Sequence, residues 1–107
     1  MQIIIDWARL EEEARYAARR AYVPYSHFTV GAAILTSDNQ IYAGCNIENA
    51  SYGLTNCAER TAVFAARILG EMSEIKALCV YTPTRVATPP CGACRQVLNE
   101  FGPQMLV

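Results

Sequence analysis

Two short cysteine motifs constrain this chain more than any other feature of its sequence. Cys91 and Cys94 follow a proline-rich stretch, and Cys57 begins the segment Cys57-Ala58-Glu59. Two thiols with two residues between them have metal-chelating spacing. Both motifs fall where a helix is predicted to begin, and the partial positive charge of a helix N-terminus favours thiolates. The fold must therefore bring two helix N-termini together if these thiols are to share one ion.

The pattern of apolar and turn-forming residues predicts a single layered domain over residues 1–107. Helices are expected at 6–21, 55–69 (capped by Thr55 or Asn56) and 91–101. Buried strands are expected at 28–36 and 75–82, and the returning strand of a hairpin is expected at 40–47. The strand–helix–strand stretch implies a right-handed crossover and at least one parallel pair. We expect an α/β fold with αβα layers and a mixed sheet.

Composition narrows the classes of partner. Nine Lys+Arg against ten Asp+Glu give a net charge of −1, and no basic cluster is long enough to follow a phosphate backbone. No apolar run reaches the length of a membrane span, and residues 1–5 are too short for a secretory signal. We expect a cytoplasmic protein that binds a small molecule, with no nucleic acid and no membrane. Its five cysteines, an odd number in a reducing compartment, then favour metal binding over disulfides.

The thiols predict a catalytic metal centre. Zinc prefers four ligands, so Cys57, Cys91 and Cys94 leave one position for water. Zinc makes hydroxide available from that water at neutral pH, and Glu59 can carry the proton. Three thiolates give the centre a net negative charge, which Arg60 can offset through hydrogen bonds to the sulfurs. We expect one Zn²⁺ per chain at the N-termini of two helices.

Four motifs follow one another along the chain. They are Val23-Pro24-Tyr25-Ser26-His27-Phe28, Asn46-Ile47-Glu48-Asn49-Ala50-Ser51-Tyr52-Gly53, Cys57-Ala58-Glu59-Arg60-Thr61-Ala62 and Pro90-Cys91-Gly92-Ala93-Cys94-Arg95-Gln96. With them, the chain resembles the small, homotetrameric, zinc-dependent cytidine deaminases that act on free nucleosides. The resemblance implies hydrolysis of cytidine and 2′-deoxycytidine to uridine and 2′-deoxyuridine, with zinc-bound hydroxide attacking C4 and ammonia released. It also implies a role in pyrimidine salvage and active sites shared between the subunits of a homotetramer.

The resemblance assigns three residues to the base. Phe28 would stack on the pyrimidine, and the backbone around Ala58 would bind its edge. Glu59 would protonate ring N3 and then the departing amine. Taken alone, Phe28 opens a buried strand and would more often belong to the core, so its role depends on the motif around it.

The resemblance assigns other residues to the sugar. Asn46 and Glu48 would bind the ribose 3′-hydroxyl, since residues two apart on an extended segment face the same way. Ala50 and Tyr52 would contact the sugar in a neighbouring subunit's site. No residue has a comparable assignment to the 2′-hydroxyl. Family members continue with another strand and a C-terminal helix, and we expect this sequence, which stops at Val107, to lack them.

Two other classes of protein remain open on the residues alone. The Cys91–Cys94 motif opens a helix after a strand and loop, as in thioredoxin-like redox proteins, although this leaves Cys57-Ala58-Glu59 unexplained. A fourth ligand such as His27 would instead make the zinc site structural. Within the deaminases, an enzyme that acts on a nucleoside antibiotic is a further alternative.

Overall fold

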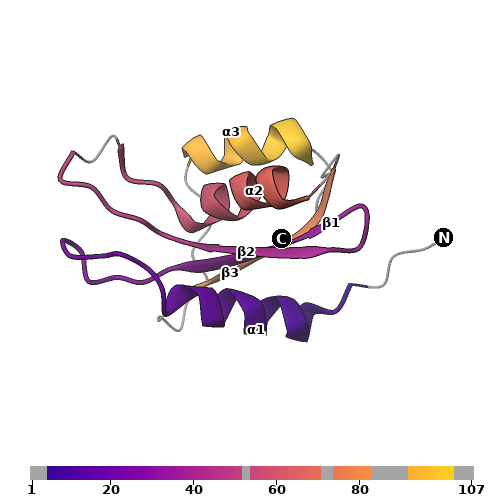
Figure 1. Ribbon diagram of the computed structural model, residues 1–107, viewed down its shortest axis with the longest axis horizontal. Coiled ribbons are helices and arrows are strands. Elements are labelled where there is room, and N and C mark those ends of the chain that lie inside the picture. Colours follow the sequence, from indigo (N-terminus) through magenta and orange to yellow (C-terminus); the bar gives the residue numbers. More distant parts are fainter. Residues whose placement is uncertain (1–4, 52–53, 71–73, 83–91, 103–107) are drawn as a thin grey trace.

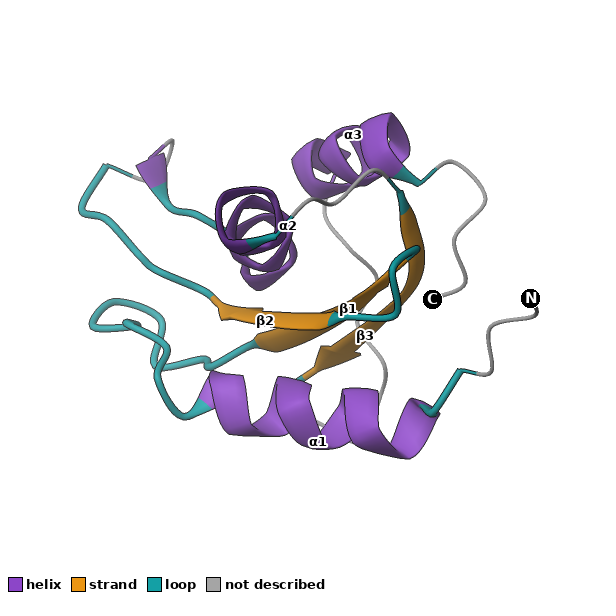
Figure 2. Cartoon of the chain, turned by 45° about the vertical axis from the view of Figure 1, so that its right-hand side comes forward, coloured by secondary structure: helices purple, strands orange, loops and turns teal. Residues whose placement is uncertain are grey.

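The computed structural model describes residues 5–51, 54–70, 74–82 and 92–102. Its helices are α1 (Trp7–Ala18), α2 (Ala58–Leu69) and α3 (Gly92–Phe101). Its strands are β1 (Gly31–Thr36), β2 (Ile41–Cys45) and β3 (Ile75–Tyr81). The sheet lies between α1 on one face and α2 with α3 on the other (Figures 1 and 2). The predicted layered α/β fold is therefore confirmed.

Both faces of the central strand are buried, which explains its unbroken apolar sequence. Alternate residues of β1 point to opposite faces and enter two separate clusters. The cluster under α1 contains Leu10, Ala14, Ala33, Leu35 and Ala77. The cluster under α2 contains Ala32, Ile34, Ala58, Ala62, Val63, Ala66, Ile75 and Leu78. Many of these side chains are alanine, so both helices lie close to the sheet.

The strand order is β2-β1-β3, and β1 pairs antiparallel with both neighbours. The predicted parallel pair is therefore absent from the strands that the structure describes. Strands β2 and β3 both run opposite to β1 and are hence parallel to each other, as the strand–helix–strand stretch predicts. They do not pair because β1 lies between them. The tight β1–β2 hairpin leaves the other edge of β1 to β3, and the sheet of these strands is antiparallel.

Two element boundaries differ from the predicted ones in ways that matter for the site. The first strand begins at Gly31 rather than at residue 28, which leaves Phe28 outside the sheet. The predicted cap of α2 is also wrong, because the N-cap is Cys57 and its side chain makes no capping bond. The Asn56 amide instead donates to Thr61 Oγ1 at 3.0 Å. Cys57 is thus the residue that directly precedes the first N–H groups of the helix.

Gly44 on β2 sets the distance between the sheet and α2. A Cβ atom there would lie 2.4 Å from the backbone nitrogen of Ala62 and 2.7 Å from the carbonyl oxygen of Ala58. These are helix backbone atoms, which cannot rotate away as a side chain can. Glycine therefore permits a contact that holds the first turns of α2, and with them Cys57 and Glu59, against the sheet.

We expect Gly44→Ala to destabilise the fold by about 1–3 kcal/mol, the usual cost of overpacking a core. Gly70→Ala is the matched control, because its closest neighbour is the hydroxyl oxygen of Tyr42, 1.9 Å away at the end of a side chain that can move. The measurement is the urea midpoint of unfolding. Equal losses of stability in the two variants would contradict the proposed backbone contact.

Candidate active site

The N-terminus of α2 gathers groups suited to holding a cation next to a proton carrier. The half-buried Cys57 occupies the N-cap position. Arg60, one turn further on, donates from Nη2 to Cys57 Sγ at 3.4 Å and to the carbonyl oxygen of Thr55 at 3.2 Å. The guanidinium group and the helix N-terminus both place positive charge beside the sulfur. This is the environment that stabilises a thiolate ligand.

Glu59 lies in the first turn of the same helix and is only 5% exposed. The preceding residue, Ala58, is completely buried. Removing a carboxylate from water is costly unless a charge, a hydrogen bond or a ligand compensates it. A nearly buried carboxylate two residues from a thiol is therefore a candidate for chemistry rather than for solubility.

The second cysteine motif lies only partly within the described residues. Cys94 belongs to the first turn of α3, whereas Cys91 is outside the described residues. Helices α2 and α3 pack side by side on one face of the sheet (Figure 2). No group of three metal-binding side chains occurs among the residues that the structure describes. The three-thiol ligand set therefore stays a prediction.

The predicted sugar-binding pair, Asn46 and Glu48, holds the segment that carries Phe28. Asn46 Oδ1 accepts from the Val30 amide at 2.9 Å, and Asn46 Nδ2 donates to the carbonyl oxygen of Phe28 at 2.9 Å. The backbone of the pair also bonds to Tyr22, with distances of 3.0 Å and 2.8 Å. Residues 22–30 and 46–48 therefore form one connected loop region at the end of the sheet (Figure 1).

The Glu48 carboxylate is bound by the same segment. Its Oε1 atom accepts from the backbone amides of Tyr25 and Ser26 at 3.0 and 3.2 Å, and its Oε2 atom accepts from the Ser26 hydroxyl. The Ser26 hydroxyl, the two amides and the nearby His27 lower the pKa of Glu48 from its ordinary value of 4.5. The ionised Glu48 carboxylate therefore stabilises the folded state above the pKa that Glu48 has in the unfolded chain. This contribution is lost as pH falls through the lower folded-state pKa.

The predicted neighbour-facing residues are Ala50 and Tyr52, and the structure describes residues 49–51 and 54–55 of this stretch. Ala50 is exposed, and Tyr52 lies outside the described residues. Thr55 Oγ1 accepts from the Asn49 amide at 3.1 Å, and Asn49 Oδ1 accepts from the Ser51 amide at 2.9 Å. These bonds are local to the loop, so Ala50 is presented outward.

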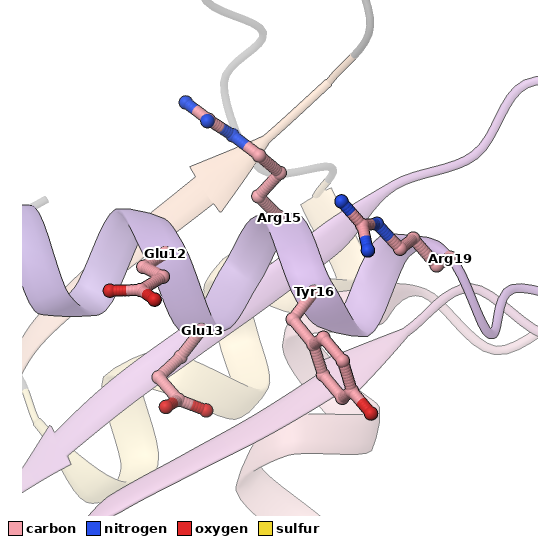
Figure 3. Close-up of a pocket in the computed structure, with 5 residues that line it drawn as sticks. All are labelled: Glu12, Glu13, Arg15, Tyr16 and Arg19. Carbon is pink, nitrogen blue, oxygen red and sulfur yellow. The ribbon is translucent and has the colours of Figure 1, made fainter.

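A separate hollow of about 480 Å³ lies against the exposed side of α1 (Figure 3). Its described lining consists of Glu12, Glu13, Arg15, Tyr16 and Arg19. Arg15 is paired with Glu11 at 3.0 Å. Helix α1, against which the hollow lies, and helix α2, which contains Glu59, are on opposite sides of the sheet (Figure 2). Its described side chains include no thiol, and we do not assign it to the site.

Comparison with known proteins agrees with this geometry. The family model of the cytidine and deoxycytidylate deaminase zinc-binding region matches residues 6–107. The cytidine deaminase of Sporosarcina psychrophila is 55% identical over 97 residues, which cover 91% of this chain and 71% of the relative. The crystal structure of cytidine deaminase from Mycobacterium tuberculosis has a TM-score of 0.89 and 47% identity, and the match covers 96% of this chain and 83% of that one. The crystal structure of cytidine deaminase from Burkholderia pseudomallei has a TM-score of 0.81 and 50% identity, and the match covers 90% of this chain and 76% of that one.

Proposed function

The chain belongs to the zinc-dependent cytidine deaminase family, and from this premise we propose that residues at the start of α2 hydrolyse both cytidine and 2′-deoxycytidine. The observation that carries the proposal is the nearly buried Glu59 beside Cys57, whose sulfur accepts a hydrogen bond from Arg60. Family membership also overturns the thioredoxin-like alternative. A redox role would not explain the nearly buried carboxylate of Glu59.

The donor chemistry fits the family's zinc ion. We propose that Cys57, Cys91 and Cys94 hold one ion per chain, since thiolates at helix N-termini suit zinc. When bound, zinc lowers the pKa of water enough to provide hydroxide at neutral pH. Arg60 offsets part of the ligands' negative charge through its bond to Cys57 Sγ.

Glu59 handles the protons of the reaction. In the proposal it takes a proton from water and delivers it to ring N3 as a C–O bond forms at C4. It then takes the second proton from the new C4 hydroxyl group and delivers it to the exocyclic amine as the C–N bond breaks, so that cytidine and water give uridine and ammonia. Phe28 stacks on the ring, and the backbone at the buried Ala58 binds its edge. Burial of Glu59 keeps bulk water from competing for these protons.

We expect Glu59→Gln to lower turnover of cytidine by at least ~10²-fold, the scale of general acid–base catalysis, because the amide cannot carry a proton. The measurement is loss of cytidine absorbance, with zinc content determined on the same samples. Glu12→Gln on the exposed face of α1 is the control and should retain wild-type turnover. A fast, zinc-loaded Glu59→Gln enzyme would rule out Glu59 as the proton carrier.

Recognition of the sugar is assigned to the 3′-hydroxyl. A carboxylate has about four acceptor positions, and described donors occupy three on Glu48, so one remains for a substrate hydroxyl. Both ends of the Asn46 side chain already bind the backbone of residues 28–30. We therefore assign the direct bond to Glu48 and a supporting role to Asn46. No described side chain is assigned to the 2′-hydroxyl.

Cytidine and 2′-deoxycytidine should accordingly have kcat/KM values within roughly tenfold, about 1.4 kcal/mol. A 3′-deoxy analogue should be much poorer, because it leaves a polar group of the site unpaired. In Glu48→Ala, most of the difference between cytidine and 3′-deoxycytidine should disappear. Strong discrimination against 2′-deoxycytidine would reveal a contact to the 2′-hydroxyl and contradict the assignment.

The assembly that we propose is a homotetramer with composite active sites. Phe64 and Ile68 lie one turn apart on the outer side of α2 and are 47% and 81% exposed. Leu54, just before this helix, is 71% exposed. Apolar side chains that gather on one side of a helix are typical of subunit contacts. Such contacts would bring the loop with Ala50 and Tyr52 towards a neighbouring site.

We expect light scattering to give a tetramer for the native chain and smaller species for Ile68→Glu, because burying an unpaired charge is costly. Turnover should fall together with the mass, since a composite site needs its neighbour. Ala8→Glu, on the exposed side of α1, should leave both unchanged. A fully active monomer would refute the composite site.

The remaining parts of the proposal concern partners and location. No helix in the described part of the chain is long and apolar enough to cross a membrane. We propose a free nucleoside rather than a nucleic acid as the substrate, because the net charge is −1. Three thiols used as ligands suit the reducing cytoplasm.

A further inference from the structure

Ser26 occupies a position that the sequence motifs left without a role. Its hydroxyl donates to Glu48 Oε2 at 2.5 Å and accepts from the Phe28 amide at 3.1 Å. One side chain thus bonds both to the carboxylate assigned to the sugar and to the backbone of the aromatic residue assigned to the base.

The Phe28 backbone is held at both of its polar groups. Its N–H group donates to Ser26 Oγ, and its C=O group accepts from Asn46 Nδ2 at 2.9 Å. Phe28 lies outside β1, so it has no strand ladder to fix it. The side chains of Ser26 and Asn46 therefore hold the Phe28 backbone in place, as sheet hydrogen bonds do for the residues of β1.

The chain between Ser26 and Phe28 adopts an uncommon conformation. His27 has φ of 58°, in the left-handed region that residues other than glycine rarely adopt. This turn lets the Phe28 amide reach back to Ser26 Oγ. A backbone of this kind persists only when surrounding bonds hold it, and here the bonds run through Ser26 to Glu48.

We propose that Ser26 is a positioning residue that couples ring stacking by Phe28 to sugar binding by Glu48. The inference deepens the proposed function and depends on it. The Ser26 hydroxyl needs no contact with the nucleoside. It orients the Oε2 atom left for the 3′-hydroxyl and fixes the backbone from which the aromatic ring projects. Loss of the hydroxyl therefore weakens recognition of base and sugar together.

Ser26→Ala tests this directly through steady-state kinetics with cytidine and 3′-deoxycytidine. We expect KM for cytidine to rise about tenfold, the scale of one hydrogen bond to a charged group, while kcat changes less than about twofold. The preference for cytidine over 3′-deoxycytidine should also narrow. Ser26→Thr keeps the hydroxyl and should restore both values. Unchanged KM in the alanine variant, or no recovery with threonine, would overturn the proposal.

Thr36→Val provides the matched control for a lost turn hydroxyl. Thr36 Oγ1 bonds to Asp38 and Gln40 in the hairpin turn at the far end of β1. This variant should lose stability yet keep the native KM and sugar preference. If Thr36→Val raises KM as much as Ser26→Ala, the effect is general destabilisation and the proposal fails.

Two further measurements separate the possible failures. If Ser26→Ala does not fold, Ser26→Cys replaces the hydroxyl with a weak donor and acceptor and should raise KM in the same way. A native enzyme that does not act on cytidine would defeat the proposed function itself. A native enzyme that is active and discriminates at the 3′ position, with Ser26 variants that match it, would defeat only the role of Ser26.

Discussion

The close contact between α2 and the sheet is the constraint on which the site depends. Gly44 places no side chain between β2 and the helix backbone, and Ala58, Ala62 and Ala66 present only methyl groups. A helix held at backbone distance has little freedom to slide or tilt, because interiors are packed to crystal-like density. Its N-terminus is therefore fixed, and Cys57 and Glu59 with it. The small residues at this contact therefore fix the position of the candidate site, because they let the helix backbone approach the sheet closely.

Much of the layered fold could be predicted, because apolar periodicity directly reports which faces are buried. The helix caps were less predictable. Thr55 and Asn56 are better capping residues than Cys57 by propensity, yet Asn56 bonds to Thr61 instead and the helix begins one residue later. Strand pairing was the other failure. Sequence order shows that β2 and β3 are joined by a crossover, but whether a third strand lies between them depends on long-range pairing that local patterns do not encode.

The site divides in the same way. Chemical type and spacing predict roles in the site for Cys57, Glu59 and Arg60, because few other functions need those groups so close together. Spacing could not reveal that Asn46 and Glu48 bond to residues 25–30, since the two segments are about twenty residues apart in sequence and meet only in the fold. The sequence signal for the role of Ser26 is its position two residues before Phe28. Such a serine can bond to the amide two residues on, although the sequence does not show what else it binds.

The two halves of the site are stabilised in different ways. The half that we assign to the metal is built on a helix whose backbone is packed against the sheet, so its geometry follows from the core. The half that we assign to the nucleoside consists of loop residues 22–30 and 46–48, which lie at the end of the sheet and are held by polar bonds. Charge-assisted bonds around Glu48 are stronger than neutral ones, yet they are exposed to water, which weakens them. We therefore expect substitutions in these loops to alter nucleoside recognition more readily than they alter the chemical step, because the residues assigned to that step are held by the packed helix.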